Sequence, residues 1–315
     1  MIFNTKCLII GSGVAGCTAG IYTANANLEP IIICGELGGQ LATTGCVENF
    51  PGFESIQGSE LTDKMRQQAE KCGAKIIMDL IESVDLSTKP FVALSSSNKY
   101  IAETIIIATG AKAKWLGLAS EDKYKGFGVS ACAVCDGNFY KNKIVAVIGG
   151  GNTAITEALY MSKIAQKVYL IHRNKNFKAE QILLKRISET NNIDIMTDFV
   201  VDEILGDEDA IGKFVNGIKL KNTLDGSIKK IDVNGVFVAI GHKPDVKLFE
   251  NQLELTPNGY IKTDKITKET SVKRVFACGD VQEEFHKQAV VACGSGCICA
   301  LEVEKLLMQN NSKKN

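Results

Sequence analysis

The strongest constraint on the fold is one pattern that occurs twice, in two stretches far apart in the chain. Each stretch is an apolar, β-branched run, then a glycine cluster, then a small-residue helix pattern: KCLIIGSGVAGCTAGIYTANA from Lys6 and KIVAVIGGGNTAITEALYMSKIA from Lys143. A second apolar strand follows each one, EPIIICGE and QKVYLIHR. Strand, helix and strand in this order build a parallel sheet through a right-handed crossover. The sequence therefore predicts an α/β chain with two nucleotide-binding domains.

Further apolar runs indicate where these domains meet. The run AETIIIATGA ends near Ala111, and the run NGVFVAIGHKPD covers residues 234–245; each ends in a glycine-containing turn. A chain of 315 residues has room for two domains of ordinary size. We expect the second domain to be inserted between two halves of the first, with residues 1–112, 113–243 and 244–315 as the three parts.

The first glycine cluster, GSGVAG, suits a dinucleotide. Gly11 allows the tight turn, Gly13 lets a phosphate approach the backbone, and Gly16 lets the helix pack on the strand. The pyrophosphate would lie at the N-terminus of the helix. Glu36, about twenty residues after the cluster, is suited to a ribose hydroxyl. The alternative is a glycine turn with a purely structural role.

The second cluster, GGGNTA, has Gly149, Gly151 and Ala154 at the matching positions. An NAD site usually has an acidic residue at the end of the following strand. Here that strand is followed by basic residues: His172, Arg173, Lys175 and Lys178. A basic patch favours the 2′-phosphate of NADP, although a solvated basic loop is the plainer interpretation.

Composition limits the compartment and the partners. Thirty-six basic and 36 acidic side chains cancel, so nucleic acid or an anionic membrane is not the expected main partner. No apolar run is long enough to span a bilayer, and the N-terminus has no leader pattern. Eleven cysteines, an odd number in a long chain, are not typical of a secreted disulfide scaffold. We expect a cytoplasmic protein with mostly reduced thiols.

Cys132 and Cys135, in the segment SACAVCDG, could bind a metal, close a structural disulfide or carry electrons. A zinc site needs further ligands, but the chain has three histidines and no second pair with this spacing, so we expect no metal. The other cysteine-rich segment, with Cys293, Cys297 and Cys299, is flanked by small and apolar residues and is expected to be inert core thiols.

A redox dithiol is the interpretation that these residues favour. A two-residue spacer lets the sulfurs close a small ring and tends to lower the pKa of one thiol. Asp136 follows directly and could transfer a proton during thiol–disulfide exchange, or simply cap a turn. Together with two nucleotide sites, the pair predicts a relay in which a nicotinamide reduces a flavin and the flavin reduces the disulfide.

These motifs resemble, in order and along nearly the whole chain, the low-molecular-weight (bacterial-type) thioredoxin reductase family. The matching segments are GSGVAG at 11–16, GGQL at 38–41, VENFPGF at 47–53, ATGA at 108–111, GVSACAVCDG at 128–137, GGGNTA at 149–154, HR at 172–173, FVAIGHKP at 237–244, CGDV at 278–281 and KQA at 287–289.

The resemblance implies two Rossmann-like, three-layer domains, with an NADPH domain inserted into an FAD domain, in a homodimer. For FAD it implies these residues: Gly11, Ser12, Gly13, Val14, Ala15, Gly16, Glu36, Gly38, Gly39, Gln40, Leu41, Asn49, Val84, Ala108, Thr109, Gly110, Gly279, Asp280, Lys287, Gln288 and Ala289. For NADPH it implies Gly149, Gly150, Gly151, Asn152, Thr153, Ala154, His172, Arg173, Lys178, Ile240 and Gly241.

The resemblance also implies the chemistry. Electrons would pass from NADPH through FAD to the dithiol and on to the disulfide of thioredoxin, which maintains cell redox homeostasis. Cys135 would lie nearer the flavin, Cys132 would attack thioredoxin, and Asp136 would be the acid. The two domains would rotate about the boundary segments between flavin reduction and exposure of the dithiol.

Some positions depart from the family pattern. Asn174 and Lys178 replace arginines in the basic run. The lysine keeps the charge but loses the bidentate contacts, and we expect the NADPH preference to survive in a weaker form. Lys287 replaces an arginine and Val14 a proline. Two alternatives remain: a related reductase with another dithiol protein or ferredoxin as acceptor, and a zinc-stabilised nucleotide-binding regulator. The dithiol argues against ferredoxin, because ferredoxin-linked relatives lack the pair.

Overall fold

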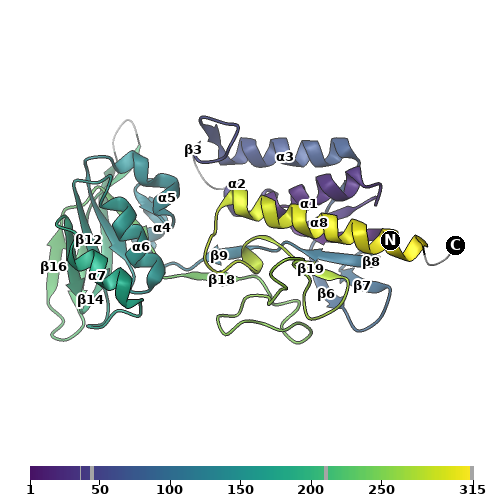
Figure 1. Cartoon of the computed structure of the whole chain (residues 1–315). Coiled ribbons are helices and arrows are strands. Elements are labelled where there is room, and N and C mark those ends of the chain that lie inside the picture. Colours follow the sequence, from purple (N-terminus) through teal and green to yellow (C-terminus); the bar gives the residue numbers. More distant parts are fainter. Residues whose placement is uncertain (36, 43–45, 209–211, 313–315) are drawn as a thin grey trace. The chain divides into compact units, whose positions relative to one another are not determined.

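The computed structural model describes residues 1–35, 37–42, 46–208 and 212–312. The chain forms two compact units: Met1–Lys112 with Lys243–Asn315, and Ala113–His242. The connections between them, β9 (Ala111–Ala113) and β18 (His242–Pro244), pair with each other as a two-stranded sheet. Each unit is described separately below and is labelled in Figure 1.

The first unit is built on a mainly parallel sheet with the strand order β5-β2-β1-β8-β7-β6, in which β19 also pairs with β8. β8 is shared because its first half pairs antiparallel with β7 and its second half parallel with β19. The strand bounds are β1 Ile2–Ile10, β2 Ile31–Cys34, β5 Lys75–Met78, β6 Ile81–Asp85, β7 Phe91–Ser95, β8 Lys99–Ile107 and β19 Val275–Ala277.

Helices α1 (Val14–Asn25), α3 (Gly58–Cys72) and α8 (Ala289–Ser312) lie side by side on one face of this sheet (Figure 1). α3 ends because Gly73 takes the left-handed conformation (φ 107°) that closes many helices. The shorter elements of this unit are α2 (Gly39–Ala42), β3 (Cys46–Val47), β4 (Ile56–Gln57) and a 3-10 turn at Gly279–Val281.

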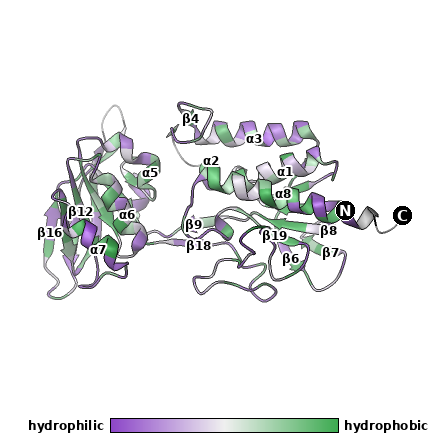
Figure 2. Ribbon diagram, in the orientation of Figure 1, coloured by the Kyte–Doolittle hydropathy of each residue, from purple (hydrophilic) through white to green (hydrophobic). Residues whose placement is uncertain are grey.

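Both faces of the central strands are buried, as parallel sheet requires. Alternate residues point to opposite sides: Leu8 and Ile10 join one core cluster, whereas Cys7 and Ile9 join another with residues of α1 and α8. In Figure 2 the central strands are coloured as hydrophobic, while α3 carries hydrophilic residues along its length. The unbroken apolar runs in the sequence reflect this burial on two sides.

The second unit has a parallel sheet with the order β10-β17-β11-β12-β13: Val129–Ser130, Gly235–Val238, Ile144–Ile148, Lys167–His172 and Ile193–Thr197. α6 (Asn152–Met161) and α7 (Gln181–Ser188) pack on one face. The antiparallel strands β14 (Phe199–Glu208), β15 (Lys213–Asn222) and β16 (Ile228–Ile231) cover the other. The remaining elements are α4 (Ala119–Tyr124), α5 (Ala133–Asp136) and a 3-10 turn at Gly137–Tyr140.

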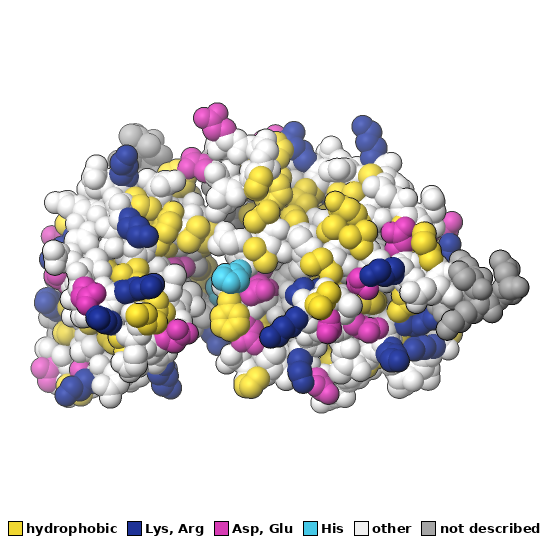
Figure 3. Space-filling view, in the orientation of Figure 1, with side chains coloured by type: hydrophobic (Ala, Val, Ile, Leu, Met, Phe, Trp, Pro, Cys, Tyr) yellow, Lys and Arg dark blue, Asp and Glu magenta, His cyan; other side chains and the backbone are white. Residues whose placement is uncertain are grey.

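The predicted α/β class with two Rossmann-like units is confirmed by these sheets. The antiparallel layer of the second unit was not anticipated. Within the described part of the chain, every helix is too short or insufficiently apolar to cross a membrane. On the face seen in Figure 3, basic and acidic side chains are interspersed, in keeping with a formal net charge of zero.

Candidate active site

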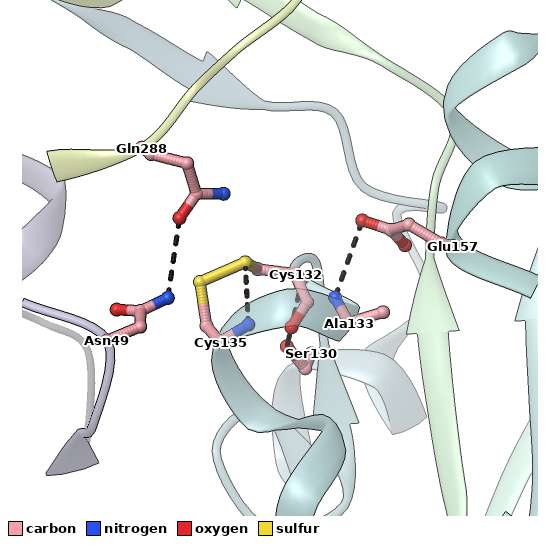
Figure 4. The surroundings of a disulfide bond; sticks show 7 residues. All are labelled: Asn49, Ser130, Cys132, Ala133, Cys135, Glu157 and Gln288. Carbon is pink, nitrogen blue, oxygen red and sulfur yellow. Dashed lines mark hydrogen bonds between the residues drawn. A yellow bond between two sulfur atoms is a disulfide. The ribbon is translucent and has the colours of Figure 1, made fainter. Parts of the chain in front are cut away.

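Cys132 and Cys135 form a disulfide in the second unit, with an S–S distance of 2.05 Å (Figure 4). The pair lies at the start of α5, directly after β10. Local hydrogen bonds hold it: the Cys132 N–H donates to Ser130 Oγ at 3.0 Å, and the Cys135 N–H donates to Cys132 Sγ at 3.2 Å. Both cysteines are half-buried, so the pair is partly accessible to solvent.

Asp136 follows the disulfide and is also half-buried. Burial raises the pKa of its carboxyl, against a lowering by a hydrogen bond from Ser130. Burial, and then the charge of Asp136, raises the pKa of Tyr140 to about 12. Asp136 therefore holds its proton to a higher pH than an ordinary aspartic acid, which is the property a proton donor beside a thiolate needs.

Glu157 is a second acid beside the disulfide, and the sequence reasoning missed it. Its Oε1 accepts the Ala133 N–H at 3.4 Å (Figure 4), and its Oε2 is buried without a hydrogen-bond partner. Burial raises the pKa of this carboxyl to about 7, against a lowering by the Ala133 N–H. A signal was available: with Ala154, Ala158 and Met161, Glu157 occupies positions i, i+3, i+4 and i+7, the buried stripe of α6.

The first glycine cluster forms a tight turn between β1 and α1. Gly11 has φ 113°, and a Cβ there would lie 2.2 Å from the Ala108 carbonyl oxygen, so a side chain is excluded. A Cβ at Gly13 would meet no heavy atom within 4 Å. Gly13 is also the N-cap of α1 and makes no side-chain capping bond. The open backbone at this helix N-terminus fits the pyrophosphate of a dinucleotide.

The structure brings distant predicted FAD residues together around this turn. A Cβ built on Gly39, in α2, would lie 3.4 Å from Gly13 Cα, and one on Gly279 would lie 3.0 Å from Ala15 Cβ. The Asn49 side-chain amide donates to Gln288 Oε1 at 3.4 Å, just before α8 begins at Ala289. The glycine turn, α2 and Gly279 therefore lie together, and Asn49 contacts the segment that leads into α8.

Asp280 and Lys287 lie in the same unit. Burial raises the pKa of Asp280 to about 6, against a lowering by Lys287. The Lys287 ammonium donates to the carbonyl oxygens of Glu283 and Glu284, both at 2.7 Å, and lies 4.6 Å from the centre of the Tyr260 ring. Lys287 therefore secures its own loop.

The remaining predicted FAD residues have mixed surroundings. Thr109 Oγ1 donates to the Asp245 carbonyl at 2.6 Å, beside the turn at Gly110. Val84 is buried in the core cluster that does not include α1, and its carbonyl accepts a hydrogen bond from Gln252 at 2.7 Å. Glu36, the predicted ribose contact, lies outside the described residues.

The second glycine cluster repeats the first between β11 and α6. The Gly149 N–H donates to the Ile171 carbonyl at 2.9 Å, just as the Gly11 N–H donates to Ile33. Gly151 is the N-cap of α6 and makes no side-chain capping bond. A Cβ at Gly149 would lie 2.4 Å from the Ala239 carbonyl oxygen, and Ala239 directly precedes the predicted contacts Ile240 and Gly241. This arrangement fits a second phosphate group.

His172 lies inside this turn instead of in the exposed basic loop. A Cβ at Gly150 would overlap its ring at 2.2 Å, and the ring stacks on Phe177 with centroids 5.1 Å apart. Burial lowers the pKa of His172, and its Nε2 is buried without a hydrogen-bond partner. His172 therefore fills the turn as a packed ring, while the exposed Arg173 and Lys178 supply positive charge.

The Lys178 backbone fixes the loop against the turn, since its N–H donates to the Gly150 carbonyl at 2.7 Å. Asn152 is engaged with Glu180: its side-chain amide donates to Glu180 Oε1 at 3.0 Å, and its Oδ1 accepts the Glu180 N–H at 2.9 Å. These bonds hold the basic loop beside the start of α6.

The cysteines of α8 are not arranged like the disulfide pair. Cys299 is buried, its thiol lies 3.6 Å from the Ala277 carbonyl, and burial raises its pKa. Burial also raises the pKa of Cys293. Among the described residues, His, Cys, Asp and Glu side chains form no group of three or more that could hold a metal ion.

Comparison with known proteins assigns the chain. Residues 5–296 match the model of the pyridine nucleotide-disulphide oxidoreductase family. A thioredoxin reductase of Rickettsia conorii is 51% identical over 98% of this chain and 99% of its own length, and one of Escherichia coli O157:H7 is 48% identical over 96% of each.

A solved structure gives the same answer. The thioredoxin reductase from Giardia duodenalis has a TM-score of 0.91 and 40% identity, covering 97% of this chain and 99% of that one. The chain therefore belongs to the low-molecular-weight thioredoxin reductases of the pyridine nucleotide-disulphide oxidoreductase family, which are flavoenzymes that use FAD and NADPH.

Proposed function

We propose that this enzyme uses NADPH to reduce the disulfide of a thioredoxin, with Cys132 and Cys135 as the dithiol that exchanges with it. The observation that carries the proposal is the closed, half-buried disulfide of the second unit, with an acid of raised pKa directly after it. The relatives with similar sequences are thioredoxin reductases over nearly their whole length.

FAD would be held in the first unit by the turn at Gly11–Gly16, α2, Asn49, Asp280 and the start of α8. The open position at Gly13 and the uncapped start of α1 support this fit. Bound FAD supplies the step between two-electron hydride chemistry and disulfide reduction. The Asp280 carboxyl, with its pKa raised to about 6, would accept or donate a hydrogen bond at a ligand hydroxyl.

NADPH would bind at the second cluster, with its pyrophosphate at the start of α6. Arg173 and Lys178 would contact the 2′-phosphate, because both are exposed cations on the loop that packs against Gly150. His172 would support the turn with its ring packed over Gly150 and would contribute no full charge, since burial lowers its pKa.

Thiol chemistry then follows from the dithiol itself. The Cys132 thiolate attacks one sulfur of the thioredoxin disulfide, forming a mixed disulfide and releasing a thiolate, which takes a proton from Asp136. Cys135 attacks Cys132 Sγ, releases reduced thioredoxin and closes the intrachain disulfide again. The assignment of Cys132 to the attack and Cys135 to the flavin side rests on the family resemblance.

Two further features belong to this proposal. We propose that the enzyme is a homodimer, which rests on the resemblance alone. We also propose that it works in the cytoplasm. In support, Cys7 and Cys17 are free and buried, with burial raising the pKa of each to about 12, so these thiols stay protonated and unreactive.

The test is thiol release. Wild-type enzyme with NADPH and a candidate thioredoxin should produce free thiols, and Cys135→Ser should lose at least about a thousandfold in turnover, because the exchange cannot be completed. Cys72→Ser, which changes a half-buried thiol of α3, is the matched control and should keep wild-type turnover. Equal turnover by Cys135→Ser and wild type contradicts the proposal, as does a wild type that NADPH reduces but thioredoxin does not reoxidise.

A further inference from the structure

The exchange chemistry proposed above leaves the Glu157 carboxyl, which lies beside the dithiol, without a role. Glu157 lies on the inner stripe of α6 beside Ala154, Ala158 and Met161, each of which is fully buried. Its Oε2 is inaccessible and has no partner, and its Oε1 contacts only the Ala133 N–H among the hydrogen bonds of the described residues. A charged carboxyl in such surroundings lowers the stability of the fold. The presence of Glu157 at this position therefore calls for a functional explanation.

The Ala133 contact connects Glu157 to the dithiol. Ala133 immediately follows Cys132, is completely buried, and is the first residue of α5, the turn that carries Cys135. Reduction of the disulfide produces a thiol and a thiolate. A thiolate one residue from this hydrogen bond repels a Glu157 carboxylate, and like-charge repulsion favours its protonated form.

The elements packed around Glu157 carry several cations, but none of them contributes to the pKa of Glu157 and so none offsets this repulsion. α6 packs against α5, α7, β11 and β12. Besides the two cysteines, the titratable and charged side chains on α6 and these elements are Asp136, Tyr160, Lys167, Tyr169, His172, Lys185 and Arg186. None of them moves the pKa of Glu157, which burial raises to about 7 and the Ala133 N–H lowers in part.

We propose that Glu157 is a positioning residue for the dithiol: its carboxyl holds the Ala133 N–H and takes up a proton when the Cys132–Cys135 disulfide is reduced. The inference rests on the proposed function of that dithiol. One NADPH, the disulfide, the Glu157 carboxylate and one proton give NADP⁺, one thiol, one thiolate and protonated Glu157. Two electrons and two protons are thus taken up together, and the Glu157 carboxyl carries one of these protons.

Proton uptake is measured by equilibrating the FAD-loaded enzyme, without oxygen, with dithiothreitol buffers of fixed potential and trapping free thiols for mass analysis. At fixed electron potential, two-proton uptake lowers the equilibrium constant for reduction about a hundredfold per pH unit and one-proton uptake about tenfold. Over the pH unit above about 7, the equilibrium constant should fall about a hundredfold for wild type and about tenfold for Glu157→Gln. Glu189→Gln, the same change at an exposed residue of this unit, should behave like wild type.

A second measurement can refute the inference with the wild-type enzyme alone. The infrared difference spectrum of reduced minus oxidised wild type should gain the C=O band of a protonated carboxyl. The band should persist in Asp136→Asn and disappear in Glu157→Gln. Absence of this band in wild type, or the same proton uptake in Glu157→Gln and wild type, overturns the inference.

These readouts are separate from the proposed function. If wild type takes up two protons but reduces no thioredoxin, the proposed acceptor is wrong and the role of Glu157 stands. If thioredoxin is reduced while Glu157→Gln keeps the wild-type uptake, the role of Glu157 is wrong and the acceptor stands.

Discussion

In the first glycine turn, the second position is Ser12, whose Oγ lies 2.8 Å from the Cys34 thiol at the end of β2. In the second turn, the matching position is Gly150, and the imidazole of His172 at the end of β12 lies over it. The backbones correspond, since Gly11 and Gly149 make the same hydrogen bond to the neighbouring strand. The two turns differ in where the larger side chain lies. In the first turn the side chain belongs to the turn itself, whereas in the second turn Gly150 leaves space for the His172 ring of the following strand.

This difference in side-chain size shows that one backbone motif can present two different surfaces. The first turn is lined by a small hydroxyl and a thiol, and is followed by the helix packing of α1 on α8. The second encloses an imidazole and is followed by an exposed basic loop. Local geometry makes both turns suitable for a phosphate, and the residue at the end of the following strand determines which side chains surround it.

The largest expected effect comes from closing the position that is open in both turns. Gly13→Val should keep the first unit folded, because a Cβ there meets nothing within 4 Å, but should abolish FAD binding by blocking the phosphates. Gly151→Val should do the same for NADPH, since the nearest atom to its Cβ is the Lys178 carbonyl at 3.9 Å. Flavin absorbance and NADPH titration, with circular dichroism as the folding control, check this. Wild-type FAD content in Gly13→Val contradicts it.

Removing the acid that adjoins the dithiol should have the next largest effect. Asp136→Asn should slow thiol transfer to thioredoxin about a hundredfold or more, because the leaving thiolate loses its proton donor. Since burial raises the pKa of Asp136, the wild-type rate should fall as pH rises through that pKa, and the variant should lack this limb. Single-turnover thiol release over a pH series measures both. An unchanged pH profile in the variant rules out Asp136 as the acid.

Removing one cation from the basic loop beside the second turn should have a smaller effect. Arg173→Ala and Lys178→Ala should each raise KM for NADPH about tenfold and leave KM for NADH unchanged, because one charge-assisted contact to the 2′-phosphate is lost. Lys175→Ala, also exposed on this loop, is the control. Equal changes with both nucleotides would place these cations elsewhere than at the 2′-phosphate.

Stability should respond to pH through Glu157. Its pKa in the folded protein is about 7 against an ordinary 4.5, so the folded state binds the extra proton. The free energy of unfolding should therefore fall as pH rises from about 4.5 to about 7, by an amount on the order of 2 kcal/mol. Glu157→Gln should flatten this slope, which urea unfolding at several pH values can measure. A variant with the wild-type slope contradicts the assigned pKa.

Asp79, in the first unit, provides the opposite case and the smallest effect. Burial raises its pKa, but hydrogen bonds from Tyr100, Asn98, Ser95 and the Leu80 N–H outweigh burial and bring the pKa to about 2. Its contribution to stability is present above the unfolded pKa of about 3.8 and is lost as pH falls through about 2. Asp79→Asn should cost about 1 kcal/mol at neutral pH, measured by urea unfolding. Exposed Asp63→Asn, the control, should cost less; an equal cost contradicts the cluster's role.

Much of the architecture could be predicted because it depends on patterns of residues that are close together in the sequence. The paired strand-glycine-helix segments, the apolar runs and the spacing of Cys132 and Cys135 each follow from contacts within a few residues. The strands β14–β16 were missed because their pattern says nothing about which face of the parallel sheet they cover. Val84 and Asn49 were assigned through the family resemblance and remain predictions as ligand contacts.

The sequence by itself determined the α/β class, the two glycine turns and the dithiol, because backbone sterics and side-chain periodicity act at short range. Only the tertiary structure decided the state of individual groups. His172 is an enclosed ring and not a surface cation, Glu157 meets Ala133 across two helices, and Asp79 is held ionised by three side chains from a neighbouring hairpin. Charge depends on burial and on partners, and both come from residues that only folding brings together.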